Sequence, residues 1–229
     1  MVPDTVRPLV VVTDYTFRDD LAVEKTVLEP LGCTVVGAQC RTEQEVIAAV
    51  HDADFVLTQF APLTTRAIQA MNRARLITRY GVGVDNVDLD AARERRVPVY
   101  NVPDYCIDEV ADHTLGLILA LTRQIAVLSA GVKAGRWTSP PSLQSFHALS
   151  ELTTGVVGCG RIGRAVIARL TPFGARILAH DPALSAERIA ALGCAPVSVD
   201  QLFAESDLIT LHCPSTAETR HLIDAHSLA

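Results

Sequence analysis

The stretch TTGVVGCGRIGRAVIARLTPFGARILAHDP, residues 153–182, joins two apolar runs through a glycine-rich turn and a segment of helical periodicity. The turn has the spacing Gly-x-Gly-x-x-Gly, with the glycines Gly158, Gly160 and Gly163. After it, apolar side chains recur at the spacing of one helix face, at Ile162, Ala165, Val166 and Leu170. Apolar runs lie before the turn at 152–157 and after the helix at 175–179. The stretch therefore predicts a strand, a tight turn, a helix and a second strand, the repeating unit of a parallel α/β sheet.

The glycine turn also predicts a dinucleotide site. The first glycine of such a turn permits the bend, the second lets the backbone approach a pyrophosphate, and the third lets helix and strand pack closely. The N–H groups at the start of the helix face the anion. The second strand ends at Asp181, which is 181 − 163 = 18 residues after the last glycine. A carboxylate there would accept hydrogen bonds from both ribose hydroxyls and repel a 2′-phosphate, so the motif favours NAD over NADP.

The glycine spacing alone also occurs in ordinary strand-to-helix turns, and the surrounding elements decide the interpretation. Here the strand, the helix, the second strand and the acid follow in order, which favours dinucleotide binding. We interpret His180 as a strand-end residue and Cys159 as a contributor of backbone only. Arg164 and Arg169 are expected to be solvated on the outer face of the helix.

Composition excludes several classes of protein. The chain has 229 residues, 49% of them hydrophobic, and a formal net charge of −6. Its longest Lys/Arg cluster is Arg95-Arg96, which argues against a nucleic-acid or anionic-membrane surface. The most apolar run, 115–121, is far shorter than the ~20 residues of a membrane-spanning helix, and nothing resembles a signal peptide. We expect a cytoplasmic protein whose partners are small molecules, not nucleic acid or membrane.

Cysteines and histidines indicate no metal site. The six cysteines form no C-x-x-C motif and no pairing with histidine at metal-ligand spacing, so we expect reduced and mostly buried thiols. His113 lies in an expected helix and His212 at an expected strand end. Each is more readily explained as structural than as catalytic.

Strands and helices alternate along the chain, and the alternation restarts near residue 153. Strands are expected at 9–13, 34–37, 55–58, 76–79, 97–100, 152–157, 175–179, 195–197 and 207–211. Between them, helices are expected at 20–28, 42–51, 64–71, 89–95, 186–192 and 200–204, and after Arg161. This pattern predicts an α/β protein with two doubly wound parallel-sheet domains, residues 1–103 and 104–229. A long helix at 107–128, entered at Asp104 or Asp108, should connect them, and Pro140-Pro141 should mark a surface loop.

Five separated segments resemble one family: YGVGVDNVDL at 80–89, NVPDYCIDEVADHTLGLILAL at 101–121, GVVGCGRIG at 155–163, AHDP at 179–182 and DLITLHCPSTAETRHLID at 207–224. The chain is similar over nearly its whole length to the D-isomer-specific 2-hydroxyacid dehydrogenases. This resemblance implies a flavodoxin-like substrate domain and a Rossmann NAD domain. It further implies a homodimer, and reversible hydride transfer between NAD(H) and C2 of a 2-hydroxy or 2-oxo acid in the cleft.

The resemblance also implies roles for individual residues. The loop Gly81-Val82-Gly83 would present backbone N–H groups to the substrate carboxylate, with Val82 near the nicotinamide. Read without the family, the loop is a strand-to-helix turn capped by Asp85 or Asn86. The implied cofactor-binding residues besides Val82 are Gly158, Gly160, Arg161, Ile162 and Gly163 at the pyrophosphate, Asp181 at the ribose, and Cys213, Pro214 and Thr219 in a covering loop.

The chain departs from the family at its end. The catalytic Arg, Glu and His of the family, with the last strands of the Rossmann domain, would lie beyond Ala229, so no catalytic residue is expected within the chain. His221 and His226 precede the positions of these groups and do not replace them. Three readings stay open. The first is most of a dehydrogenase. The second is an NAD-binding protein without turnover, truncated or like the corepressor members of the family, and the third is an α/β domain that binds no nucleotide.

Overall fold

The computed structural model describes residues 7–17, 20–137, 146–225 and 227. The chain divides into two compact units, Met1–Tyr105 and Cys106–Ala229. The sequence pattern predicted this division two residues earlier, after residue 103.

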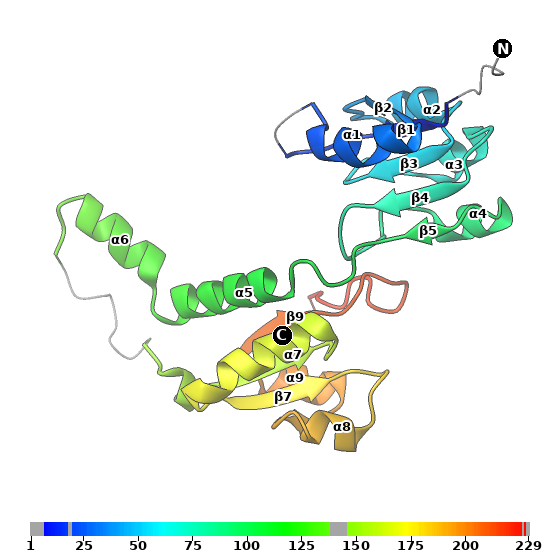
Figure 1. Cartoon of the computed structure of the whole chain (residues 1–229). Coiled ribbons are helices and arrows are strands. Elements are labelled where there is room, and N and C mark those ends of the chain that lie inside the picture. Colours follow the sequence, from blue (N-terminus) through cyan, green and yellow to red (C-terminus); the bar gives the residue numbers. More distant parts are fainter. Residues whose placement is uncertain (1–6, 18–19, 138–145, 226, 228–229) are drawn as a thin grey trace, which may run out of the picture. The chain divides into compact units, whose positions relative to one another are not determined.

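The first unit contains a five-stranded sheet in which all neighbouring strands are parallel, in the order β2-β1-β3-β4-β5 (Figure 1). Its strands are β1 (Leu9–Val12), β2 (Thr34–Gly37), β3 (Phe55–Thr58), β4 (Leu76–Arg79) and β5 (Val99–Tyr100). Its helices are α1 (Ala22–Leu28), α2 (Glu43–Val50), α3 (Thr65–Ala70) and α4 (Leu89–Glu94), with a 3₁₀ turn η1 (Glu29–Leu31). The order 2-1-3-4-5 is that of flavodoxin-like doubly wound sheets.

Alternating side chains of these strands fill two cores, because successive residues of a strand point to opposite faces of the sheet. Val11, Val56 and Ile77 pack with apolar residues of α2, α3 and α4 on one face. Val10 and Val12 pack on the other face, where Leu28 of α1 joins them. With both faces covered, the carboxyl edge of the sheet is the place where its loops can carry function.

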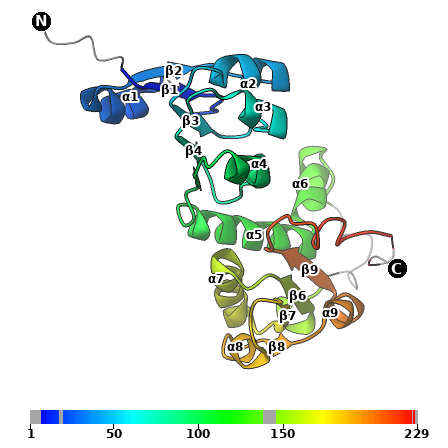
Figure 2. The ribbon, with the colours of Figure 1, turned by 90° about the vertical axis from the view of Figure 1, so that its right-hand side faces the viewer.

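The second unit contains a four-stranded parallel sheet in the order β8-β7-β6-β9. The strands are β6 (Thr153–Val157), β7 (Arg176–His180), β8 (Ala195–Pro196) and β9 (Leu208–Leu211). The helices are α5 (Ile107–Thr122), α6 (Ile125–Lys133), α7 (Arg161–Leu170), α8 (Ala186–Ala190) and α9 (Val199–Glu205), with 3₁₀ turns η3 (Leu149–Glu151) and η4 (Thr171–Phe173). Figure 2 shows α5 and α7 side by side in this unit.

Two ion pairs join α7 to α5 and correct the expectation that Arg169 is solvated. Nη2 of Arg169 lies 2.8 Å from Asp108 and Nε lies 2.5 Å from Asp112. Arg164 is exposed, as expected, and its Nε donates to the carbonyl of Cys159 at 2.8 Å. Helical periodicity identified the apolar face of α7, but it carried no information about which acids on α5 face the helix.

The expected long helix at 107–128 is wrong in its extent. The structure has two helices, and Gln124 between them adopts a left-handed conformation with φ 50°. The cap is also different, since Cys106 and not Asp104 or Asp108 is the N-cap residue. Pro140-Pro141 lie outside the described residues.

Within the described ranges no single helix is long and apolar enough to cross a membrane. The pair α5 and α6, bent by 65° at their break, meets the length and composition test only when the two are taken together.

Asp14, which follows β1, binds the loop that follows β3. Its carboxylate accepts hydrogen bonds from the N–H groups of Gln59 (3.0 Å) and Phe60 (2.6 Å) and from the hydroxyl of Thr13 (2.9 Å). Burial by itself raises the pKa of Asp14, but these donors outweigh it, so that the pKa lies below its ordinary value. The ionised carboxylate therefore fixes a loop at the carboxyl edge of the sheet.

We predict that Asp14→Asn lowers the free energy of unfolding of the first unit by about 2 kcal/mol near neutral pH, because a charged acceptor of several hydrogen bonds is lost. A lowered folded-state pKa contributes stability that is complete above the unfolded pKa and disappears as the pH falls through the folded value. The difference between wild type and variant should therefore shrink below the ordinary pKa of 3.8.

Urea unfolding followed by tyrosine fluorescence measures this effect, since the four tyrosines all lie within residues 15–105. Asp90→Asn is the control, because Asp90 is exposed and, among the described residues, its carboxylate forms an ion pair only with Arg93 on its own helix. Equal stability of Asp14→Asn and wild type at neutral pH would contradict the assigned role.

Candidate functional site

The three glycines of the turn after β6 occupy different environments. Gly158 has φ 91°, and a Cβ on it would lie 2.6 Å from the backbone nitrogen of Cys213. A Cβ on Gly163 would lie 2.0 Å from the carbonyl oxygen of Gly158. A Cβ on Gly160 would meet no heavy atom within 4 Å. The first and third glycines are therefore required by the turn and by its packing, whereas the fold leaves space at the second.

Helix α7 begins directly after this open position, with Gly160 as its N-cap residue. The N–H groups of Arg161, Ile162 and Gly163 form the first turn of the helix and have no acceptor one turn earlier within it. They lie at the positive end of the helix dipole. A turn with open space and unsatisfied donors is suited to the oxygens of a phosphate group.

Asp181 lies beside the same turn, although 22 residues separate it from Cys159. Its Oδ2 accepts the N–H of Cys159 at 2.7 Å, and its Oδ1 accepts the N–H of Ala183 at 2.9 Å. Each carboxylate oxygen has a further lone pair, so the group can still accept hydrogen bonds from ribose hydroxyls. The hydrogen bond to Cys159 holds the carboxylate at one end of the glycine turn.

The loop after β9 contacts this turn at its beginning. The N–H of His212 donates to the carbonyl of Val157 at 2.7 Å, and the backbone of Cys213 packs against Gly158. Farther along, the hydroxyl of Thr219 donates to the carbonyl of Pro214 at 2.6 Å. The structure thus brings Cys213 to the turn, and it ties Pro214 and Thr219 to each other. Their contacts with a cofactor stay predictions.

Cys159 lies in the turn and His212 lies beside it. The shifted pKa values of both side chains argue against acid–base or redox roles. Burial, followed by the nearby charge of Asp181, raises the pKa of the Cys159 thiol to about 11, so the thiol is protonated at neutral pH. Burial lowers the pKa of His212, and its Nε2 lies 3.0 Å from the hydroxyl of Thr210. His113 is exposed on α5. His180 makes one strand-end contact, from Nδ1 to the carbonyl of Val197.

The loop Gly81-Val82-Gly83 lies in the first unit, directly after β4. The N–H of Gly81 donates to the carbonyl of Arg79, and φ of Gly81 is 151°. The carbonyl groups accept hydrogen bonds from Val102 and from the amide of Asn101. No described residue accepts a hydrogen bond from the N–H of Val82 or of Gly83. Two of the three expected donors are therefore available to an anion.

The helix that follows this loop is capped differently from the sequence expectation. Asp88, not Asp85 or Asn86, accepts the N–H of Ala91 at the start of α4. Asn86 instead donates its side-chain amide to the carbonyl of Ala61. The N-cap residue of α4 is therefore farther along the chain from the glycine loop than expected, and the residues next to the loop do not cap the helix.

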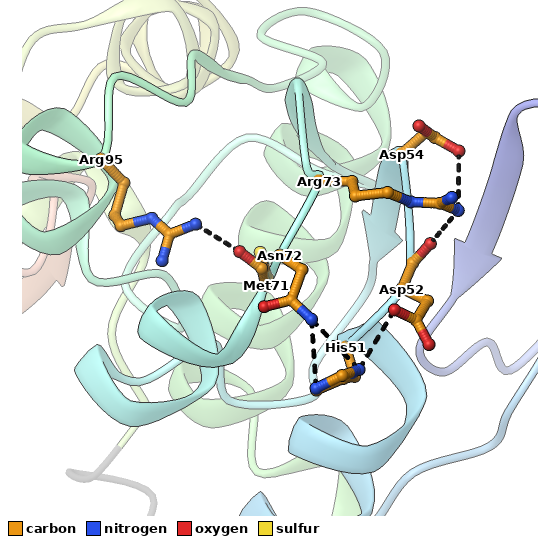
Figure 3. Close-up of polar contacts among 7 residues, drawn as sticks. All are labelled: His51, Asp52, Asp54, Met71, Asn72, Arg73 and Arg95. Carbon is orange, nitrogen blue, oxygen red and sulfur yellow. Dashed lines mark hydrogen bonds and ion pairs between the residues drawn. The ribbon is translucent and has the colours of Figure 1, made fainter.

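A separate polar cluster lies at the amino ends of β3 and β4, the edge opposite to the glycine loop (Figure 3). Its contacts join neighbouring loops. Arg73 donates to the carbonyl of Asp52 and to the carboxylate of Asp54. The side chain of Asn72 contacts the ring of His51, and Arg95 donates to the carbonyl of Met71. Nδ1 of His51 also lies 3.2 Å from Oδ1 of Asp52. The cluster holds no serine or cysteine, and among the described residues no group of His, Cys, Asp and Glu could hold a metal ion.

Sequence reasoning did not single out Arg79. This residue ends β4, and its guanidinium group lies against Gly81. The sequence feature that could have indicated this position was its place at the carboxyl end of a strand, two residues before Gly81.

Comparison with known proteins places these features in a family. Residues 115–229 match the model of the D-isomer specific 2-hydroxyacid dehydrogenase, NAD binding domain. The chain is 42% identical over 186 residues to a D-3-phosphoglycerate dehydrogenase of Mycobacterium leprae, covering 81% of this chain and 35% of that protein. It is 35% identical over 224 residues to the enzyme of Methanocaldococcus jannaschii, covering 96% of this chain and 41% of that protein.

Solved structures agree with the sequence matches. The crystal structure of D-lactate dehydrogenase from Aquifex aeolicus, complexed with NAD and lactic acid, has a TM-score of 0.83 at 29% identity, covering 96% of this chain and 64% of that chain. The chain spans about a third of the length of the first curated relatives that it matches. The glycine turn, the acid after β7 and these matches together show that the chain belongs to the D-isomer-specific 2-hydroxyacid dehydrogenase family and contains its NAD-binding domain.

Proposed function

We propose that this protein is an NAD-dependent oxidoreductase that transfers hydride between NAD(H) and C2 of a 2-hydroxy or 2-oxo acid. The observation that carries this proposal is the glycine turn at β6 with Asp181 held beside it by the N–H of Cys159. A pyrophosphate would lie at the open space of Gly160 and the first turn of α7, and Asp181 would accept the hydroxyls of the adenosine ribose.

Lactate and 3-phosphoglycerate, after which relatives are named, are both 2-hydroxy acids. The free N–H groups of Val82 and Gly83 would bind the carboxylate that such acids share. Bound NAD would supply the hydride acceptor. The described residues would therefore bind and orient the cofactor and the acid, and we assign no described histidine to proton transfer.

We predict that the chain binds NADH and that Gly160→Val abolishes this binding without unfolding the second unit. A branched side chain at this position meets no protein atom at its Cβ, but it would occupy the space of the pyrophosphate. Fluorescence titration with NADH measures the affinity, and thermal unfolding measures the fold.

Gly163→Val is the contrasting variant. Its Cβ would overlap the carbonyl of Gly158, so this change should lower the melting temperature of the second unit. If a folded Gly160→Val chain still binds NADH as wild type does, the turn is not the pyrophosphate site.

A further prediction is that NADH binds at least about tenfold more tightly than NADPH, since two like charges ~4 Å apart repel by about 1–4 kcal/mol at a protein surface. Asp181→Ala should remove the discrimination, whereas Asp200→Asn should keep it, because Asp200 is an exposed acid in the first turn of α9 and not in the turn after β6. Equal affinity of wild type for the two cofactors would contradict a ribose-binding role for Asp181.

We also propose that the protein forms a homodimer through α6. This helix has no buried residue, yet most of its side chains are apolar. Ile125 is 53% exposed, Val127 60% and Val132 54%, and Leu121 at the end of α5 is 71% exposed. Apolar patches of this kind mark association surfaces. We further propose a cytoplasmic location, which would suit six free cysteines.

The double variant Val127→Asp/Val132→Asp should change the mass measured by light scattering from dimer to monomer, because two charges would have to be buried in the interface. Val23→Asp is the control, since Val23 is equally apolar and 75% exposed on α1. A monomeric wild type, or a double variant with the mass of the wild type, would contradict this interface.

A further inference from the structure

Cys159, which stands between the first two glycines of the turn after β6, is held at its side chain, its N–H and its carbonyl. The side chain is fully buried in an apolar cluster of the second unit. The N–H donates to Oδ2 of Asp181 at 2.7 Å, and the carbonyl accepts a hydrogen bond from Nε of Arg164 at 2.8 Å. Two charged side chains therefore hold the two peptide units that meet at this residue.

The hydrogen bond from Arg164 sets the orientation of the peptide unit that joins Cys159 to Gly160. A peptide unit is planar and trans, so its carbonyl and its N–H point in opposite directions. Holding the carbonyl on Arg164 therefore directs the N–H of Gly160 away from that side chain. No described residue accepts a hydrogen bond from this N–H, so it is available to a ligand together with the N–H groups in the first turn of α7.

Gly160 itself places little restraint on this peptide unit. If the unit turned over, φ of Gly160 would change from −69° to a positive value, and glycine adopts positive φ about as readily as negative φ. Packing adds no restraint, because a Cβ here would meet no heavy atom within 4 Å. The hydrogen bond to Asp181 restrains only the preceding peptide unit. Among the described residues, Arg164 is the side chain that holds the unit between Cys159 and Gly160.

The orientation of this unit decides what the turn offers to an anion. Successive backbone N–H groups attract a phosphate, and the N–H of Gly160 extends the donors of α7. After a reversal the unit would offer the carbonyl oxygen of Cys159 instead, and its partial negative charge would repel a phosphate. Arg164 is well placed to prevent the reversal, since its own N–H donates to the carbonyl of Gly160 at 3.0 Å.

We propose that Arg164 is a positioning residue of the cofactor site. By holding the carbonyl of Cys159, it keeps the following peptide unit in the orientation that presents the N–H of Gly160 to the pyrophosphate. The inference rests on the proposed function and deepens it, because it assigns the restraint of the turn to one exposed side chain. Arg164 takes no part in hydride transfer.

The first measurement uses the isotope-labelled chain without ligand and follows two nuclear magnetic resonance signals, the carbonyl carbon of Cys159 and the amide of Gly160. Arg164→Met keeps much of the length of the side chain and suits a helix, but it removes the donor. The carbonyl resonance should move upfield, because a carbonyl that loses a hydrogen bond is less polarised, and the amide resonance should shift or broaden. An arginine that only contacted a bound phosphate would leave both signals in place.

The second measurement is the affinity of the same chains for ADP-ribose and for adenosine, followed by the amide resonance of Ala183 beside the acid. ADP-ribose contains the pyrophosphate, whereas adenosine lacks it but keeps the ribose hydroxyls that are proposed to bind Asp181. Arg164→Met should weaken the binding of ADP-ribose by about tenfold, the effect of losing one hydrogen bond to a charged group. The binding of adenosine should stay unchanged.

Arg176→Met is the matched control. Arg176 begins β7 at the opposite edge of the same sheet, where it pairs with Glu205, and its replacement removes the same charge. It should leave the Cys159 carbonyl resonance and both affinities unchanged. Arg164→Lys keeps a charged donor without the planar fork, so it should restore part of the carbonyl shift and, in proportion, part of the affinity for ADP-ribose.

Three results overturn the inference: an unmoved Cys159 carbonyl resonance in Arg164→Met, an unchanged affinity for ADP-ribose, or equal weakening of ADP-ribose and adenosine. The first would show that Arg164 does not hold the peptide unit, and the last that it supports the fold in general. A wild type that binds neither ADP-ribose nor NADH contradicts the proposed function. The carbonyl resonance of the ligand-free chain still reports in that case whether Arg164 holds the turn.

Discussion

The close approach of α7 to the turn after β6 is the constraint on which the second unit depends. There is no room for a methyl group between Gly163 and the carbonyl of Gly158, and Gly158 itself lies against the backbone of Cys213. This contact sets where α7 begins, and it therefore sets where the N–H groups of its first turn lie. It also brings the loop after β9 next to the turn, so one backbone contact arranges three segments of the candidate cofactor site.

Carboxylates at the carboxyl edges of the two sheets serve different purposes. Asp14 follows β1 and accepts hydrogen bonds from two backbone N–H groups and from the hydroxyls of Thr13 and Thr58, which leaves the group satisfied within the protein. Asp181 follows β7 and accepts one N–H at each oxygen, so each oxygen keeps a lone pair for a ligand. Donors of the protein itself therefore satisfy the first carboxylate, whereas the second could still accept hydrogen bonds from the ribose of the proposed cofactor.

The break between α5 and α6 decides which apolar residues of this region are buried and which are exposed. A continuous helix over 107–128 would continue the face of α5 that packs on α7. Because Gln124 is left-handed, the chain turns, and α6 leaves that face with no residue buried. The exposed Val127 and Val132 then need a partner to cover them, and a second copy of the chain is the one that we propose.

The sequence by itself determined the class of the fold, the nine strands found among the described residues, and the glycine turn with its acid. Those features depend on local patterns. The strands follow from runs of apolar residues, and α7 follows from apolar residues that recur about every 3.6 positions. The turn follows from glycines that need φ > 0 or close backbone contact. The helix break at Gln124, the cap at Asp88 and the ion pairs of Arg169 were decided by tertiary structure. They depend on which neighbours a residue meets across the fold, and sequence spacing carries no such information. The contacts of Arg79 with Gln59, Phe60 and Gly81 belong to the same group.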